Sequence, residues 1–148
     1  MVTENVLVGG EESGGIAIKG FIPERDGIWI GLTLWEFMAK TGKSLDDLIQ
    51  EVYDVVGSFA MGRIDMHITE EIKQKVLANC KAGKYTSFGS YKIEKTEDLD
   101  GFKFHLGNGE WVMIRASGTE PVLRVYSESD TDENASKILA ATKAVLLA

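Results

Sequence analysis

The chain has 148 residues, 44% of them hydrophobic, which is about one domain's length with enough apolar side chains for a core. Its formal net charge of −7 argues against a nucleic-acid or anionic-membrane partner, because both need an extended basic surface. Cys80 is the single cysteine, so an internal disulfide is excluded and a reducing, cytoplasmic location is expected. No signal peptide or long apolar stretch is present, and we expect no membrane partner.

The first part of the chain is predicted to consist of a short strand, a polar loop and two helices. Residues 6–8 predict a short strand that leads into a glycine-rich loop over 9–15. Asp26 predicts the start of a helix over 27–41, and a second capped helix is predicted from Ser44 to Gly57. Apolar residues surround most of the first helix, so we expect it to be covered on two sides. A lone strand feeding a polar loop is typical of a fragment of a longer protein.

The rest of the chain reads as a second module, which gives two domains, 1–57 and 58–148. Its fold class is predicted as α+β, with a mixed or antiparallel sheet and helices on one face. The expected elements are an extended segment over 58–67, a helix from Thr69 to 81, strands over 102–106, 111–114 and 122–126, and a helix over 132–147. In the helix after Thr69 we expect Cys80 to point inward and Lys73 to point to solvent, and neither Cys80 nor His67 or His105 to act in catalysis.

The segment R-A-S-G-T-E-P-V-L-R, residues 115–124, predicts a phosphate site between two strands. Guanidinium groups match phosphate oxygens, and a glycine-containing turn can form a nest of backbone N–H groups around an anion. Strand alternation directs Arg124 away from the side of Leu123 and Val125, so Arg115 and Arg124 can converge across the turn. The candidate phosphate-binding residues are Arg115, Ser117, Gly118, Thr119 and Arg124.

The glycine-rich loop over 9–15 allows two interpretations. Its glycines let a ligand approach the backbone, and the carboxylate of Glu11 and the hydroxyl of Ser13 suit sugar hydroxyl groups. The alternative is a solvated surface turn, because such compositions are common in loops.

Two motifs carry a resemblance to a known family. R-A-S-G-T-E-P at 115–121 resembles the phosphate-binding loop, usually R-P-S-G-T-E-P, of the α-D-phosphohexomutases, the phosphoglucomutase/phosphomannomutase family. G-G-E-E-S-G-G at 9–15 is similar to the family's sugar-binding loop, G-E-x-S-G, and D-G-I-W follows it at 26–29. Ala116 stands in place of the usual proline, and Gly15 stands where some bacterial members have histidine.

The resemblance implies the C-terminal part of a four-domain enzyme that interconverts hexose 1- and 6-phosphates. Residues 1–57 would be the helical, C-terminal portion of an incomplete α/β sugar-binding domain, the third, and residues 58–148 would be the α+β phosphate-binding C-terminal domain. Glu11 and Ser13 would bind sugar hydroxyls, and Arg115, Ser117, Gly118 and Thr119, helped by Arg124, would bind the phosphate that is not transferred. The family's phosphoserine loop and its D-G-D-x-D-R magnesium loop do not occur here. The fragment is thus expected to hold no catalytic residue and no Mg2+ ligand, and to need the missing N-terminal domains and a hexose phosphate as partners.

Two other functions remain open from the sequence. The chain could be a stand-alone phosphate- or phosphosugar-binding module without catalysis, or a purely structural or interaction domain.

Overall fold

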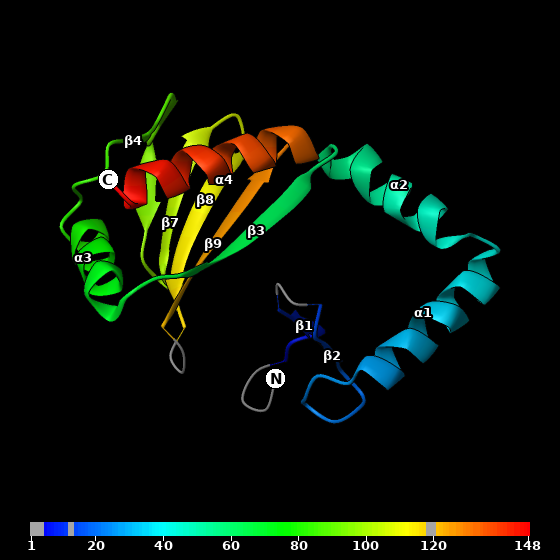
Figure 1. Ribbon diagram of the computed structural model, residues 1–148. Coiled ribbons are helices and arrows are strands. Elements are labelled where there is room, and N and C mark those ends of the chain that lie inside the picture. Colours follow the sequence, from blue (N-terminus) through cyan, green and yellow to red (C-terminus); the bar gives the residue numbers. More distant parts are fainter. Residues whose placement is uncertain (1–4, 12–13, 118–120) are drawn as a thin grey trace. The chain divides into compact units, whose positions relative to one another are not determined.

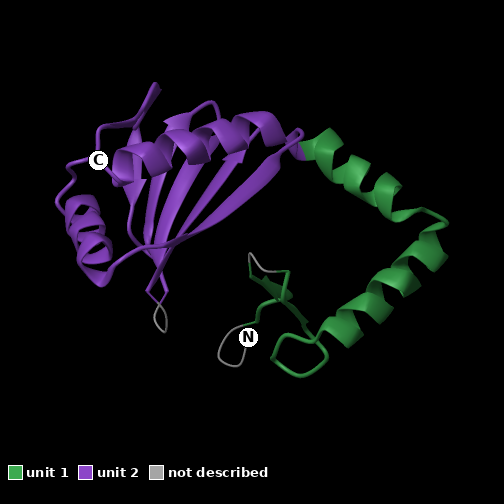
Figure 2. Cartoon of the chain, viewed as in Figure 1, with its two compact units in different colours: residues 1–55 green, residues 56–148 purple. Residues whose placement is uncertain are grey.

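The computed structural model describes residues 5–11, 14–117 and 121–148, and the chain divides into two compact units, 1–55 and 56–148 (Figure 2). We call them unit 1 and unit 2. The elements, labelled in Figure 1, are β1 (Val8–Gly10), β2 (Ile16–Ile18), α1 (Gly27–Thr41), α2 (Leu45–Val56), β3 (Ala60–His67), α3 (Glu70–Lys81), β4 (Ser87–Phe88), β5 (Tyr91–Lys92), β6 (Lys95–Glu97), β7 (Phe102–Gly107), β8 (Glu110–Ala116), β9 (Val122–Ser129) and α4 (Asp132–Leu146).

The strands of unit 1 form a short antiparallel hairpin. Val8 pairs with Ile18 and Gly10 pairs with Ile16, so β1 begins at Val8 and includes two glycines. The predicted strand over 6–8 is therefore displaced by two residues. Apolar side chains suggested its position, whereas pairing with β2 decides which backbone groups are bonded.

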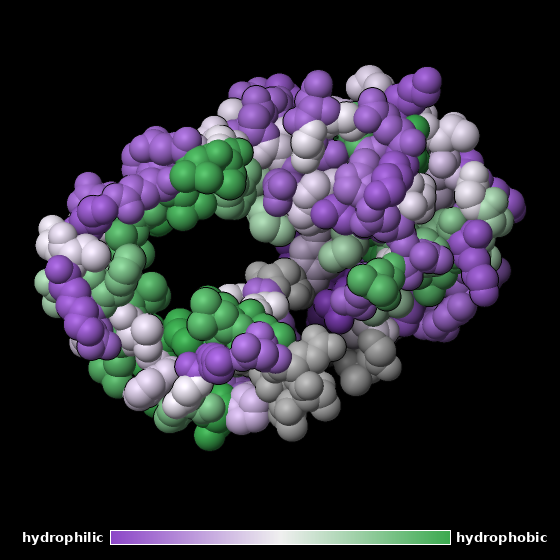
Figure 3. All heavy atoms as spheres, turned by 180° about the vertical axis from the view of Figure 1, so that it is seen from behind, coloured by the Kyte–Doolittle hydropathy of each residue, from purple (hydrophilic) through white to green (hydrophobic). Residues whose placement is uncertain are grey.

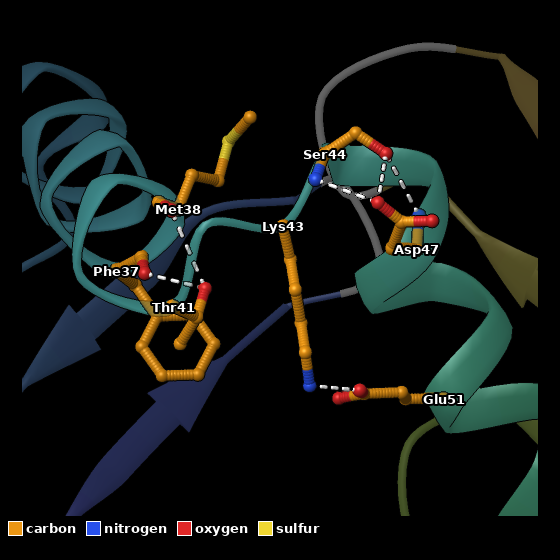
Figure 4. Close-up of polar contacts among 7 residues, drawn as sticks. All are labelled: Phe37, Met38, Thr41, Lys43, Ser44, Asp47 and Glu51. Carbon is orange, nitrogen blue, oxygen red and sulfur yellow. Dashed lines mark hydrogen bonds and ion pairs between the residues drawn. The ribbon is translucent and has the colours of Figure 1, made fainter.

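The helices of unit 1 begin and end at the predicted signals. Asp26 accepts the Trp29 N–H at 2.8 Å, and Gly42 ends α1 in a left-handed conformation with φ of 69°. Before α2, the Ser44 N–H donates to Asp47 Oδ2 at 2.8 Å, and the Asp47 N–H donates to Ser44 Oγ at 3.1 Å (Figure 4). This reciprocal pair is a capping box. Hydrogen bonds from the Ser44 side chain and backbone lower the pKa of the Asp47 carboxyl group.

The expectation that the first helix is covered on two sides was wrong for the described residues. No residue of α1 or α2 is buried, and Ile28, Trp35 and Val55 are 80%, 72% and 84% exposed. Apolar residues, coloured green, gather along these helices in Figure 3. The reason is the small size of the hairpin, because β1 and β2 have three residues each and offer little surface for packing.

Unit 2 is built on a five-stranded antiparallel sheet with the order β3-β9-β8-β7-β6, and the predicted fold class is confirmed. The long strand β3 pairs along its full length with β9, from Ala60 opposite Ser129 to His67 opposite Val122. Helix α4 lies across one face of the sheet (Figure 1), and its Ala135 carbonyl accepts the Ser127 hydroxyl at 2.9 Å. Strand residues on this face alternate with those on the other.

The core of unit 2 lies between the sheet and its helices. Phe104 on β7 is 1% exposed and meets Phe88 edge to face, with ring centroids 5.2 Å apart. The buried cluster consists of apolar residues: Met66, Val76, Cys80, Phe88, Phe104, Val112, Ile114, Leu123, Val125, Ile138, Leu139 and Leu146.

Cys80 lies inside this core, as the sequence predicted, and its thiol is expected to be unreactive in the folded chain. Burial raises the pKa of Cys80 to about 12, so very little thiolate exists near neutral pH. We expect Ellman's reagent at pH 8 to modify the native chain at least about a hundredfold more slowly than the chain in guanidinium chloride. Equal rates would mean that α3 opens readily from the sheet.

None of the helices in the described part of the chain is long and apolar enough to span a bilayer.

Candidate functional site

Two arginines meet at one end of the central strands of unit 2. Arg115 near the end of β8 lies directly opposite Arg124 on β9. Directly paired residues project from the same face of a sheet, so both guanidinium groups start from neighbouring positions. This face is opposite to the one that carries Ser127 and α4. Such a pair of like charges is unfavourable without an anion or carboxylates nearby.

The turn that follows Arg115 is closed at its base by backbone bonding. The Ser117 N–H donates to the Val122 carbonyl at 3.0 Å, and Ser117 is 7% exposed. The bond joins the two ends of the turn between β8 and β9. Gly118 and Thr119, also predicted to bind phosphate, lie outside the described residues.

Carboxylates flank the arginine pair on both sides. Asp100 Oδ1 is 3.4 Å from Arg115 Nε, and Asp65 on β3 lies opposite Arg124. Arg63 Nε and Nη2 donate to the two Asp65 oxygens at 2.7 and 2.6 Å. These bonds are the main cause of the lowered pKa of Asp65, with a smaller contribution from the charge of Arg124. Among the described residues around this end of the sheet, three guanidinium groups thus face two carboxylates.

One donor of the arginine pair has no acceptor among the residues that the structure describes. Within the described residues, Arg124 Nε is buried and has no hydrogen-bond partner. A buried donor without a partner costs about 1 to 3 kcal/mol, so such atoms are rare in folded proteins. An anion bound beside Arg124 would supply the acceptor.

Gly101 allows the Asp100 segment to approach β8 closely. Its φ of 89° lies in the left-handed region, and a Cβ there would come within 2.7 Å of the Ile114 carbonyl oxygen. Only glycine fits both the conformation and the space. The sequence analysis did not single out Asp100 or Gly101, and the adjacent Asp-Gly pair, a common turn signal, was the available indication.

Lys73 lies on the opposite side of α3 from the one that the sequence predicted. It was expected on the solvent side of α3, but it is 8% exposed and its Nζ donates to the Ser117 carbonyl at 3.2 Å. The spacing of Lys73, Val76 and Cys80 puts all three on the buried side of the helix. The charge of lysine suggested an exposed position, but the burial of Lys73 follows from its position in the helical repeat.

The predicted sugar-binding loop lies in unit 1. The Glu11 N–H donates to the Gly15 carbonyl at 2.9 Å, and Glu11 Oε2 is 2.5 Å from Arg25 Nη1. This bond contributes most to the raised pKa of Arg25. A Cβ at Gly15 would lie 2.9 Å from Arg25 Cδ, so the absence of a side chain makes room for Arg25. Ser13 lies outside the described residues.

No group of three or more His, Cys, Asp and Glu residues is placed to hold a metal ion in the described part of the chain. His67 is exposed on β3, and His105 Nε2 lies 3.3 Å from Glu97 Oε1.

A cavity of about 370 Å³ in unit 2 is separate from the arginine pair. It lies near the start of β8, whereas Arg115 lies near the end of that strand. Its lining includes two acidic residues and consists of Val56, Ser58, Phe59, Asn108, Gly109, Glu128, Ser129 and Asp130. The two carboxylates make it a poor site for a phosphate.

The sequence matches two profiles of a single family. Residues 1–56 match "Phosphoglucomutase/phosphomannomutase, alpha/beta/alpha domain III", and residues 67–145 match "Phosphoglucomutase/phosphomannomutase, C-terminal domain".

Curated relatives agree with these matches. A "Phosphoglucomutase/phosphomannomutase" of Thermococcus kodakarensis is 33% identical over 139 residues, which cover 94% of this chain and 28% of the relative. A "Phosphoglucosamine mutase" of Methanococcus maripaludis is 35% identical over 135 residues, covering 90% of this chain and 28% of the relative. Another of Methanocaldococcus jannaschii is 32% identical over 141 residues, with shares of 94% and 29%. The chain thus spans little more than a quarter of the length of these relatives.

A solved structure shows the same fold. The X-ray structure of a phosphoglucomutase/phosphomannomutase family protein from Burkholderia thailandensis matches 95% of this chain and 28% of that chain, with a TM-score of 0.64 and 17% identity. The C-terminal-domain profile alone covers more than half of the sequence. The chain belongs to the phosphoglucomutase/phosphomannomutase family.

Proposed function

We propose that this chain is the phosphosugar-binding part of a phosphohexomutase that interconverts hexose 1-phosphate and hexose 6-phosphate through a phosphoserine and a bisphosphate. In this proposal unit 2 binds the phosphate that is not transferred, and the Glu11 loop binds sugar hydroxyls. The phosphates of glucose, mannose and glucosamine are the candidate substrates. The phosphoserine and the Mg2+ ligands belong to other domains of the enzyme, and the chain alone is inactive.

The observation that carries the proposal is the arginine pair with its unmet donor. Arg115 and Arg124 are neighbours across β8 and β9, and Arg124 Nε is buried with no acceptor among the described residues. Two adjacent guanidinium groups at the base of a closed turn suit a dianionic phosphate, which accepts several charge-assisted hydrogen bonds at once. The chain as a whole carries −7, and two arginines paired directly across β8 and β9 are best explained by an anionic ligand.

Glu11, in the glycine-rich loop over 9–15, supports the part of the proposal that concerns sugar binding. Glu11 is exposed, and its carboxylate is oriented by Arg25 at 2.5 Å. A carboxylate has about four acceptor positions, so an ion pair with Arg25 is compatible with hydrogen bonds from the hydroxyl groups of a sugar. In this proposal Arg25 is a positioning residue, because it fixes the rotamer of Glu11 without needing to contact the substrate.

Such a role suits the chemistry of phosphoryl transfer. The transferred group needs positioning and charge neutralisation more than covalent assistance from the protein. A clamp on the remote phosphate supplies binding energy that orients the reacting end of the sugar. The residues of this chain therefore bind and orient the substrate, while Mg2+, when bound by the other domains, would neutralise charge on the transferred phosphoryl group.

Replacing Arg115 by alanine tests the phosphate site. We expect Arg115→Ala to weaken the binding of glucose 1-phosphate to the 148-residue chain by about 1 to 3 kcal/mol, the range of a lost charge-assisted contact. Isothermal titration calorimetry at low salt measures the change. The control is Lys137→Ala, which removes an exposed cation on α4, at the other face of the sheet.

Two results would contradict the proposal. One is equal affinity of Arg115→Ala and the unsubstituted chain, which would remove Arg115 from the site. The other is mutase turnover by the purified chain with Mg2+ and a sugar bisphosphate, because the chain would then contain the reacting groups that we assign elsewhere.

A further inference from the structure

Lys73 is unusual among the lysines of α3 because it is buried beside the turn that carries the proposed phosphate site. It is 8% exposed, and its Nζ donates to the Ser117 carbonyl at 3.2 Å. Glu70 is one of its neighbours, with Lys73 Nζ 3.4 Å from Glu70 Oε2, and the Glu70 side chain is 57% exposed. Lysines are rarely buried to this extent, because removing an ammonium group from water is costly.

We propose that Lys73 is a positioning residue of the phosphate site, whose ammonium group holds the Ser117 carbonyl and thereby fixes the backbone that follows Arg115 at the end of β8. The inference rests on the proposed function, since it assigns Lys73 a part in phosphate binding. The inference adds to the phosphate site a residue of α3, Lys73, which lies 44 positions before Ser117 in the chain.

The two hydrogen bonds of the Ser117 backbone explain how Lys73 orients this part of the chain. Its N–H is bound to the Val122 carbonyl at 3.0 Å, and its carbonyl is bound to Lys73 at 3.2 Å. A peptide unit is planar, so holding one N–H and one C=O fixes the peptide planes on both sides of Ser117. The first turn residue after Arg115 and Ala116 is thus held from β9 and from α3. Without Lys73, the second of these planes would be free to rotate.

The charge of Lys73 separates this role from a purely structural one. A structural bond to one carbonyl needs only a neutral donor, whereas an apolar residue in place of Lys73 leaves the buried Ser117 carbonyl without this bond. A positioning role near a phosphate uses the cation twice, because the ammonium group orients the Ser117 carbonyl and adds positive potential at the end of β8 where Ser117 lies. Stability and ligand affinity should then respond differently to substitution.

The test compares three variants of the 148-residue chain. Lys73→Met keeps the length of the side chain and removes its charge and donors, whereas Lys73→Arg keeps both. Lys75→Met makes the same chemical change at an exposed position of the same helix and serves as the control. We measure the dissociation constant for glucose 1-phosphate, the amide hydrogen exchange of Ser117 without ligand, and the thermal midpoint.

We expect Lys73→Met to weaken binding by about tenfold to a hundredfold, the loss of one charge-assisted contact. Exchange at the Ser117 amide should accelerate by about tenfold or more, as local opening becomes easier. The thermal midpoint should fall, because one buried hydrogen bond is lost, and Lys73→Arg should recover most of the affinity and of the midpoint. Lys75→Met should behave like the unsubstituted chain. If Lys73→Met is unfolded, Lys73→Gln, which keeps a neutral donor and removes the charge, gives the comparison of affinity and exchange.

Two outcomes overturn the inference, and they can be told apart from failure of the proposed function. Suppose that Lys73→Met leaves the affinity and the Ser117 exchange unchanged while the unsubstituted chain binds glucose 1-phosphate. Lys73 then has no part in the phosphate site, and the proposed function stands. A fall in affinity that only parallels a fall in thermal stability, with no recovery in a folded Lys73→Arg, would assign Lys73 to structure. Absence of glucose 1-phosphate binding by the unsubstituted chain would overturn the proposed function, and the role of Lys73 in binding with it.

Discussion

Replacing Phe104 by alanine is expected to lower the free energy of unfolding of unit 2 by about 3 to 5 kcal/mol, the range for large-to-small changes at buried aromatic residues. Phe104 is 1% exposed on β7, an interior strand of the sheet, and packs edge to face against Phe88 at 5.2 Å between ring centroids. The substitution removes the apolar contact and leaves a cavity that the surrounding strands can fill only in part.

Urea unfolding followed by the indole NMR signal of Trp111 measures this loss, because Trp111 lies in unit 2 on the neighbouring strand β8. Leu99→Ala is the control, since the Leu99 side chain is 99% exposed and its removal should change stability by less than about 0.5 kcal/mol. A loss for Phe104→Ala as small as that of the control would mean that β7 does not belong to the cooperative core.

The second large effect is expected for Gly101→Ala, with a destabilisation of about 2 to 4 kcal/mol from backbone strain and overpacking together. A Cβ at this position would lie 2.7 Å from the Ile114 carbonyl oxygen and 3.3 Å from the Arg115 Cβ. Ile114 is fully buried on β8, so its backbone has little freedom to move away. The strain should instead displace the segment that holds Asp100 against Arg115.

Gly109→Ala separates the two causes of the destabilisation by Gly101→Ala, which are backbone strain and overpacking. Gly109 has φ of 80°, close to the 89° of Gly101, but nothing lies within 4 Å of its Cβ position. It should therefore show the strain of a positive φ alone, about 1 to 2 kcal/mol. Thermal unfolding of both variants gives the comparison. Equal losses would show that the contact with Ile114 contributes nothing, and the close approach of the Asp100 segment would need another explanation.

The sequence predicted the elements that local chemistry determines. The helix over 27–41 was predicted with the bounds that the structure has, because the Asp26 cap and the Gly42 terminator act within a few residues. The hairpin between β7 and β8 was also predicted, from Gly107, Asn108 and Gly109. The short strands β4, β5 and β6 were missed, since two or three residues such as Lys95–Glu97 carry no readable alternation.

Long-range pairing was the part that the sequence could not reveal. Residues 58–67 were expected to be extended, but nothing local to them indicates that β3 pairs with β9 and places Asp65 beside Arg124. The same limit applies to the site. Arg115 and Arg124 could be placed together because one turn joins their strands, whereas Asp100 and Lys73 reach the site from distant segments. Their roles, and those of Glu11 and Ser13, stay predictions until binding is measured.

The pairing of β3 with β9 also has a consequence for the synthesis of the chain on the ribosome. Ala60 pairs with Ser129 and His67 pairs with Val122, so each residue of β3 is synthesised 55 to 69 residues before its partner on β9. At roughly 5 to 20 residues per second, β3 has no partner for several seconds. Arg63 and Asp65 place charges along this unpaired edge, and such charges discourage pairing with other nascent chains. The ion pair that flanks Arg124 in the finished sheet therefore protects the same strand while the sheet is incomplete.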